Sequence, residues 1–148
     1  MRNHSEMLFT GIEPTRAPDT DAGYELASRV HAVIEPGQRR LIATGTSVAI
    51  PDGFFGSIRD RSSMAVKGVH VLGGVIDAGY RDEVKVILVN LSDTAYRVDA
   101  GDRVAQMIVQ PCAHPVLVRV DELPPADRGV DGFGSTGREP KASRRWGS

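Results

Sequence analysis

Two arginines flank a pair of hydroxyl groups in the stretch RDRSSMA, residues 59–65. Arg59 and Arg61 stand beside Ser62 and Ser63, where the sequence predicts one or two helical turns with Ser62 as the cap. Free N–H groups at a helix start, two hydroxyls and a guanidinium suit an anion such as phosphate. A solvated arginine beside an ordinary helix cap is the alternative, and these residues alone favour it.

A carboxylate and an aromatic ring stand close together in GGVIDAGYRDEVKV, residues 73–86. Two apolar runs are joined there through Ala-Gly, which predicts a hairpin with Asp77 and Tyr80 near its tip. An aspartate that closes an apolar run, with a ring three residues on, offers a general base beside a hydrophobic wall. A turn-stabilising aspartate and a strand-end tyrosine explain the same residues equally well.

Glycines alternate with other residues in RGVDGFGSTGR, residues 128–138. Glycine N–H groups and the hydroxyls of Ser135 and Thr136 suit phosphate oxygens, and Arg128 suits a terminal phosphate. Phe133 suits stacking on a flat ring. The alternative is a disordered tail, which composition by itself favours.

The rest of the chain must position these groups, and it predicts strands. Short runs rich in valine and isoleucine alternate with turn signals that contain Gly, Pro, Asn or Asp, which indicates an all-β sandwich or barrel. The runs are VHAVI, RRLIATGTSVAI, FFGSIR, VHVLGGVID, EVKVILVN, AYRV, RVAQMIV and PVLVRV. We expect a β-barrel domain over residues 1–120, an extended arm over 121–137 and a tail without structure over 138–148.

Composition excludes several classes of protein. The chain has 148 residues, 41% hydrophobic, and a formal net charge of -1, which argues against nucleic-acid or membrane-surface binding. One cysteine, Cys112, excludes an internal disulfide and a multi-cysteine zinc site, and the four histidines have no ligand spacing. The apolar run VKVILVNL is too short to span a bilayer. We expect a soluble, intracellular, cytoplasmic protein.

Taken in order, these stretches resemble the five motifs of the trimeric dUTP pyrophosphatases, or dUTPases. The motifs are DAGYELAS (21–28), GSIRDRSSMA (56–65), GGVIDAGYRDEVKV (73–86), GDRVAQMIV (101–109) and RGVDGFGSTG (128–137). The resemblance implies a distorted jelly roll, or β-clip barrel. It also implies a homotrimer whose active sites are shared between chains, with a C-terminal arm that closes over each site.

The same resemblance implies magnesium-dependent hydrolysis of dUTP to dUMP and pyrophosphate, which keeps uracil out of DNA and supplies dUMP for dTMP synthesis. Asp77 assists the attack of water on the α-phosphate. Mg²⁺ is held by phosphate oxygens and water without a direct protein ligand, and Glu25 touches it only through water. The residues implied to bind substrate are Arg61, Ser62, Ser63, Gly74, Val75, Ile76, Tyr80, Lys85, Gln106, Arg128, Phe133, Gly134, Ser135 and Thr136.

Four residues depart from the pattern of that family. Glu25 stands for aspartate, Asp60 for proline, Ser63 for glycine and Asp82 for glycine. We expect the Asp60 carboxylate to compensate part of the charge of the neighbouring Arg61. The departures keep open a second hypothesis, a dUTPase-fold regulator that binds a protein partner in a nucleotide-dependent way. A dCTP deaminase of the same fold is a third, which the absence of an obvious deaminating glutamate in the predicted hairpin disfavours.

Overall fold

The computed structural model describes residues 6–17, 20–127 and 129. Within these ranges the chain forms strands and one short helix. In order they are β1 (Leu8–Gly11), β2 (Tyr24–Ala27), β3 (Ala32–Ile34), β4 (Arg39–Ala49), β5 (Phe54–Arg59), α1 (Ser62–Ala65), β6 (Val69–Leu72), β7 (Val75–Ile76), β8 (Glu83–Asn90), β9 (Tyr96–Val98) and β10 (Arg103–Pro111).

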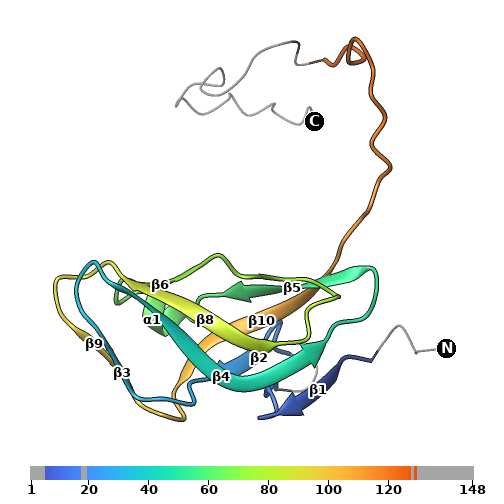
Figure 1. Ribbon diagram of the computed structural model, residues 1–148. Helices are drawn as coiled ribbons and strands as arrows, with labels where there is room; N and C mark the ends of the chain where they lie inside the picture. The colour runs from blue at the N-terminus through green and yellow to red at the C-terminus, as the bar shows by residue number, and fades with distance from the viewer. Residues whose placement is uncertain (1–5, 18–19, 128, 130–148) are drawn as a thin grey trace, which may run out of the picture. The chain divides into compact units, whose positions relative to one another are not determined.

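The strands form two four-stranded sheets and a separate pair. One sheet has the order β1-β4-β8-β6, the other β2-β10-β5-β7, and β3 pairs with β9 (Figure 1). All the pairings are antiparallel. The predicted all-β barrel class is therefore confirmed.

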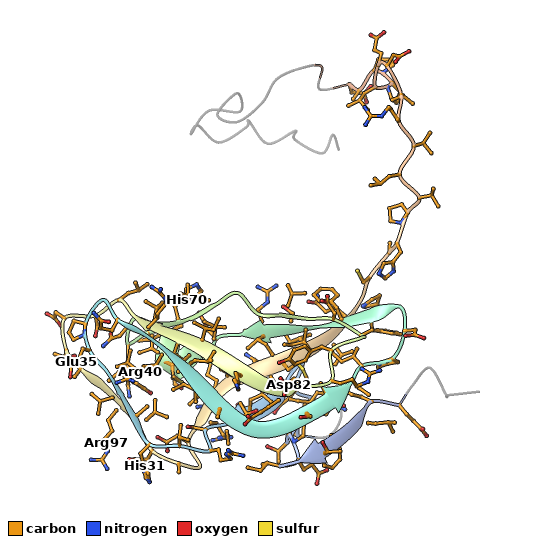
Figure 2. The ribbon with its side chains drawn as sticks, viewed as in Figure 1. His31, Glu35, Arg40, His70, Asp82 and Arg97 are labelled. Atoms are coloured by element: carbon orange, nitrogen blue, oxygen red, sulfur yellow. The ribbon has the colours of Figure 1, made fainter. Side chains whose placement is uncertain are left out.

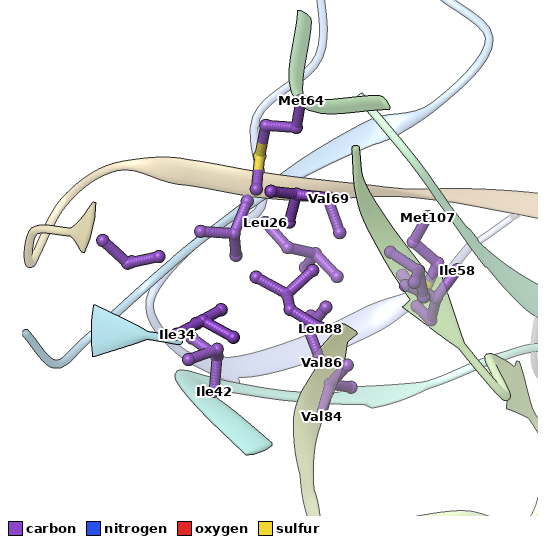
Figure 3. Packing of buried hydrophobic residues seen from close by; sticks show 14 of the residues in the cluster. Leu26, Ile34, Ile42, Ile58, Met64, Val69, Val84, Val86, Leu88 and Met107 are labelled. Carbon is purple, nitrogen blue, oxygen red and sulfur yellow. The ribbon is translucent and has the colours of Figure 1, made fainter. Parts of the chain in front are cut away.

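Alternation of side chains along the strands builds the core. Alternate residues of β8 are buried, so that Val84, Val86 and Leu88 point inward while Lys85 faces solvent. Residues from both sheets meet in a single cluster, which includes Leu88 of β8 from one sheet and Met107 of β10 from the other (Figure 3). This packing holds the two sheets together and fixes the strand ends from which the site is built.

The buried Asn90 ends β8 with every polar group engaged. Its side-chain amide donates to the carbonyls of Ile34 and Thr94 at 2.8 and 2.7 Å. Its oxygen accepts from the backbone and hydroxyl of Ser92 at 3.0 and 2.7 Å. A fully satisfied buried amide fixes the end of β8, since an unpaired polar group there would be costly.

The helix predicted after Arg61 is present, but its cap differs from the prediction. α1 covers Ser62–Ala65, and the N-cap residue is Arg61 in an extended conformation, without a side-chain capping bond. The prediction that Ser62 caps the helix was therefore wrong. Ser62 and Ser63 are both exposed on the first turn, so their hydroxyls face solvent. Of the described residues, none belongs to a helix long and apolar enough to cross a membrane.

The chain divides into two units, Met1–His114 and Pro115–Ser148. The run PVLVRV, predicted as a strand, carries no strand in residues 115–120, and Val116 and Leu117 are 87% and 96% exposed. That prediction was wrong for a single chain, because a strand needs a paired neighbour to satisfy its backbone. The division into 1–120, 121–137 and 138–148 stays a prediction, since most of the arm lies outside the described residues.

Candidate active site

A cavity of about 290 Å³ lies beside the segment that connects β7 to β8. Its walls are largely apolar and include Leu41, Ile58 and Ile87. We call it the crossover pocket. The predicted site residues that line it are Gly74, Val75, Ile76, Asp77, Tyr80 and Lys85.

The connection between β7 and β8 is a crossover and not the predicted hairpin. β7 pairs with β5 in one sheet, whereas β8 pairs with β4 and β6 in the other. Residues 77–82 therefore pass from one sheet to the other. The hairpin prediction was wrong because a two-residue turn signal says nothing about which strands the flanking runs will pair with.

Gly74 sets the backbone at the entrance to the crossover pocket. Its φ is +101°, and a Cβ atom at this position would lie 2.8 Å from the carbonyl oxygen of Ile58. The Ile58 N–H donates to the carbonyl of Gly74 at 2.7 Å. Only glycine satisfies both the dihedral angle and this close approach of two backbones.

Hydrogen bonds fix the turn that carries Asp77. The Tyr80 N–H donates to the carbonyl of Asp77 at 3.0 Å, and the Tyr80 hydroxyl donates to the carbonyl of Glu83 at 2.8 Å. The carboxylate of Glu83 accepts the N–H of Gly45 at 2.7 Å, which ties the turn to a bulge in β4. Asp82 accepts the N–H of Glu83 at 2.8 Å. Asp77 is left exposed on a well-supported turn.

A second cavity, of about 390 Å³, lies beside α1. Its lining includes Arg61, Ser63, Lys67 and Arg103, so three cationic side chains line one space, together with the carboxylate of Asp102. The Arg61 guanidinium also donates from Nη1 to the carbonyl of Arg103 at 3.2 Å. We call this cavity the arginine pocket. Its charge suits a polyphosphate.

Glu25 is the carboxylate that faces Arg61. Its Oε2 lies 2.9 Å from Nε of Arg61, and both side chains are about one-fifth exposed, at 22% and 23%. Within the described residues this oxygen accepts no well-aligned hydrogen bond. The contact with Arg61 is therefore an ion pair, and Oε2 could still accept a hydrogen bond. The carboxylate that pairs with Arg61 is therefore that of Glu25, whereas the Asp60 carboxylate contacts other groups, and charge compensation by Asp60 stays a prediction.

Asp60 contacts β6 through its carboxylate. Oδ2 lies 2.7 Å from Nδ1 of His70, and Oδ1 accepts the N–H of Val71 at 2.7 Å (Figure 2 labels His70). The carbonyl of Asp60 accepts from Nε2 of Gln106 at 2.9 Å. Gly23 lies directly behind Gln106, because a Cβ there would lie 2.7 Å from its Oε1.

Tyr96 is one of the residues that line the arginine pocket. Burial raises its pKa, and the negative charge of Asp102 raises it further, while Arg61 acts in the opposite direction. The hydroxyl therefore stays protonated at neutral pH and can donate a hydrogen bond to an anion.

The structure brings the predicted site residues into two groups. Gly74 to Asp77, Tyr80 and Lys85 line the crossover pocket, and Arg61 and Ser63 line the arginine pocket. Ser62 lies on α1, and Gln106 joins the same region through Asp60. In the described part of the chain the two pockets share no lining residue. The predicted residues that lie outside it are Arg128, Phe133, Gly134, Ser135 and Thr136.

Sequence reasoning missed several residues of the arginine pocket. Lys67 stands two residues after the motif GSIRDRSSMA, and Arg103 lies within the motif GDRVAQMIV, so their closeness to the motifs was the available signal. Tyr96 carried no signal, because it comes from a short strand outside the motifs. Together the pockets offer an apolar recess with a carboxylate at its rim and a cationic recess with hydroxyls, which suits phosphoryl chemistry on a substrate with a flat apolar part.

Comparison with known proteins gives consistent matches. The dUTPase family model matches residues 10–137. The deoxyuridine 5'-triphosphate nucleotidohydrolase of Tropheryma whipplei (strain Twist) is 44% identical over 138 residues, which cover 90% of this chain and 94% of that protein. The deoxyuridine 5'-triphosphate nucleotidohydrolase of Cowpox virus (strain GRI-90 / Grishak) is 44% identical over 124 residues, which cover 84% of each chain.

Solved structures match over most of the chain as well. The dUTPase of Staphylococcus bacteriophage 80alpha with dUpNHpp has a TM-score of 0.84 and 28% identity, and the match covers 90% of this chain and 99% of that one. That structure is described in terms of phage dUTPases that control transfer of virulence genes by a proto-oncogenic G protein-like mechanism. The native EIAV dUTPase has a TM-score of 0.72 and 28% identity, with 79% and 98% covered.

Proposed function

This chain belongs to the dUTPase family and hydrolyses dUTP to dUMP and pyrophosphate, and from that premise we propose that its two pockets bind different parts of dUTP. The crossover pocket takes the deoxyuridine and the arginine pocket takes the triphosphate. The observation that carries the proposal is the crossover pocket itself, where five of the predicted substrate-binding residues and Asp77 line a single largely apolar cavity. A flat base suits such walls, and phosphates suit converging cations.

Asp77 is the general base of the proposed reaction. Its carboxylate takes a proton from a water molecule, whose oxygen forms a bond to the α-phosphorus while the bond from that phosphorus to the bridging oxygen breaks. Pyrophosphate leaves with that oxygen. An exposed carboxylate at the rim of an apolar pocket, on a turn held by Tyr80 and Glu83, can present itself to such a water.

Selection of the base and sugar follows from the walls of the crossover pocket. The backbone groups of Gly74, Val75 and Ile76 read the polar edge of uracil, so that cytosine would leave buried polar groups unpaired. We expect the pocket, once closed around uracil, to leave no room for the methyl group of thymine. The Tyr80 ring lies against the deoxyribose and excludes a 2′-hydroxyl, because its own hydroxyl is bonded to Glu83 and the ring cannot withdraw freely.

The triphosphate lies among cations and donors. Arg61, Ser62, Ser63 and Gln106 contact it, and we add Lys67 and Arg103, which line the same cavity as Arg61. The arm completes the site, with Phe133 over the uracil and Arg128, Gly134, Ser135 and Thr136 on the phosphates. Lys85 contacts substrate from the wall of the crossover pocket.

Mg²⁺ fits the residues of this site as a partner of the substrate. In the described ranges no three His, Cys, Asp or Glu side chains are grouped as a ready-made metal site, and a magnesium ion held by phosphate oxygens and water needs none. Glu25 is the protein group that would hold the ion's water, since its side chain is partly exposed although Oε2 itself is buried against Arg61. When bound, the ion neutralises charge on the phosphates.

A homotrimer with shared sites accounts for the separation of the two pockets. Among the described residues, one chain presents them as different cavities without a common wall. In a trimer, the crossover pocket of one chain can face the arginine pocket of its neighbour, so that each dUTP lies between chains. The exposed run of residues 115–120, whose side chains include Leu117, is then available to pair with a neighbour.

The test is pyrophosphate release from dUTP, dCTP, dTTP and UTP in the presence of Mg²⁺. We expect release from dUTP alone, and for Asp77→Asn a fall in kcat of roughly 10²- to 10⁴-fold, with binding of dUpNHpp retained. Asp82→Asn is the matched control, because it lies in the same crossover and keeps an oxygen for the Glu83 N–H. If Asp77→Asn released pyrophosphate as fast as wild type, the assignment of the base would be wrong.

A regulatory role is the second candidate, and the description of the phage 80alpha dUTPase favours it. In this role the protein binds a partner protein in one nucleotide state and releases it in the other. The test is capture of partner proteins on the immobilised full chain with and without dUpNHpp. Binding that does not respond to the nucleotide would exclude a nucleotide-dependent regulator.

A further inference from the structure

We propose that Asp60 is a positioning residue that holds the phosphate-binding turn of this chain against β6. This inference rests on the proposed function, in which Arg61 and Gln106 contact the triphosphate. Asp60 itself touches no substrate in the proposal. It acts on the groups that do.

Asp60 joins separate parts of the fold through three contacts. Its carboxylate oxygens reach Nδ1 of His70 and the N–H of Val71, each at 2.7 Å. Its carbonyl receives the side-chain amide of Gln106, from β10, at 2.9 Å. One residue therefore links β6, β10 and the turn between β5 and α1.

The contacts of Asp60 leave Gln106 little freedom. Nε2 of Gln106 is engaged by the Asp60 carbonyl, and Gly23 stands so close behind the side chain that even a methyl group would touch its Oε1. The oxygen end of the amide is thus held in one orientation. If the turn moved, the carbonyl of Asp60 would move with it and Gln106 would lose its orientation.

Arg61 follows Asp60 directly and is subject to the same constraint. Its carbonyl accepts the N–H groups of Met64 and Ala65 at 3.0 Å. These are the first hydrogen bonds of α1, the helix that carries Ser62 and Ser63. Fixing Asp60 to β6 therefore fixes the start of the helix. Because a displacement of about 1 Å in such groups can cost 10²-fold in rate, a clamp one residue away is a functional element.

Asp60 is held to β6 by a backbone hydrogen bond as well as by its contact with His70. The contact with His70 is partly exposed, since the Asp60 side chain is 26% exposed and that of His70 51%. The bond from the Val71 N–H needs only an oxygen of the carboxylate. That backbone bond persists whatever the charge of His70. The expected order of importance is thus Asp60 first and His70 second.

Binding of dUpNHpp and of dUMP tests the proposal, because only the first carries the outer phosphates. In the full-length protein with Mg²⁺, we expect Asp60→Ala to weaken dUpNHpp binding and lower kcat/KM for dUTP by about 10- to 100-fold, with dUMP binding changed by less than about twofold. Asp60→Asn keeps an oxygen for the Val71 N–H and should recover kcat/KM to within about threefold of wild type. His70→Ala should lie between the two.

Controls separate positioning from general loss of structure. Asp52→Ala, in the exposed turn before β5, should behave as wild type, and the melting temperature of each variant reports folding. Should Asp60→Ala fail to fold, His70→Ala decides the question. Equal weakening of dUMP and dUpNHpp, or no weakening of either, would overturn the proposal.

Gln106→Ala in the same assays separates the proposed phosphate role of Gln106 from the proposed positioning role of Asp60. If Gln106→Ala binds dUpNHpp as tightly as wild type, the proposed phosphate role of that residue fails. If Gln106→Ala is weak but Asp60→Ala is not, the proposed function stands and the clamp alone is refuted.

Discussion

The crossover pocket and the arginine pocket are built by different means. All the predicted site residues of the crossover pocket come from one continuous stretch, Gly74 to Lys85, and its shape depends on backbone geometry at Gly74. The arginine pocket gathers side chains from separate segments and depends on pairs such as Arg61 with Glu25. The first is a backbone scaffold, and the second is a network of side chains.

This difference predicts different responses to mutation. A Cβ at Gly74 would lie 2.8 Å from the backbone of Ile58, and a backbone cannot relieve such a clash by rotating a side chain. A substitution there must therefore shift the main chain. A side-chain network has alternatives, because an arginine that loses one partner can find another or turn to water. Substitutions in the crossover pocket should therefore act more sharply than those in the arginine pocket.

Gly74→Ala is the most severe test of the backbone scaffold. A Cβ would meet the carbonyl oxygen of Ile58 at 2.8 Å, on a residue whose φ of +101° already disfavours alanine. The forced shift would displace Val75, Ile76 and the turn at Asp77, and we expect kcat/KM for dUTP to fall by at least about 10²-fold. Steady-state kinetics with dUTP measures it.

Gly79→Ala supplies the matched control in the same crossover. A Cβ at Gly79 would have no atom within 4 Å. We expect kcat/KM within about threefold of wild type and an unchanged or slightly raised melting temperature, since alanine restricts the unfolded chain. Equal losses for the two alanines would show that the crossover tolerates no change at all, and the role given to the Gly74–Ile58 approach would be lost.

Glu25 provides the corresponding test of the side-chain network. Glu25→Ala removes the partner of Arg61 at 2.9 Å, and we expect kcat/KM for dUTP to fall by about tenfold, the effect of about one charge-assisted contact. Glu25→Gln keeps an oxygen near Nε of Arg61 and should lose less. The measurement is again kcat/KM, with dUpNHpp affinity to separate binding from chemistry.

The substitutions of Glu25 could also change the affinity for dUpNHpp in the opposite direction. Glu25 places a negative charge beside a pocket proposed to bind a polyanion. If repulsion outweighed positioning, both Glu25→Ala and Glu25→Gln would bind dUpNHpp more tightly than wild type. A loss in Glu25→Ala larger than that in Gly74→Ala would reverse the ranking of the two pockets.

The sequence predicted the crossover pocket better than the arginine pocket. The all-β class and the members of the crossover pocket were predictable because strand alternation and a continuous motif are local signals. The crossover itself was not, since pairing of β7 with β5 depends on which distant strand offers an edge. For the same reason the contacts of Arg61 with Glu25 and of Asp60 with His70 could not be predicted, because they depend on how β2, β5 and β6 meet.

Substitution of Asp99 should have the smallest effect on catalysis. The pair of Asp99 with Arg97 is an exposed counterpart of the pair of Glu25 with Arg61. Oδ1 of Asp99 lies 2.8 Å from Nε of Arg97 and 3.2 Å from Nδ1 of His31, in an exposed position where β3 begins and β9 ends (Figure 2 labels Arg97 and His31). Hydrogen bonds, first from Arg97 and then from His31, lower the pKa of Asp99 below its ordinary value of 3.8. We expect Asp99→Asn to leave kcat/KM for dUTP unchanged, because none of these residues lines either pocket.

The pH dependence of stability distinguishes this pair from an inert one. A carboxylate whose pKa is lower in the folded state stabilises the fold above its unfolded pKa of about 3.8, and the contribution is lost as the pH falls below that value toward the folded pKa. Urea denaturation of wild type and Asp99→Asn over a pH series should therefore show a small difference near neutral pH that shrinks in acid. A difference that grew as the pH fell would mean that Asp99 is destabilising, and Arg97 with Asp99 could then not serve as the exposed counterpart of Arg61 with Glu25.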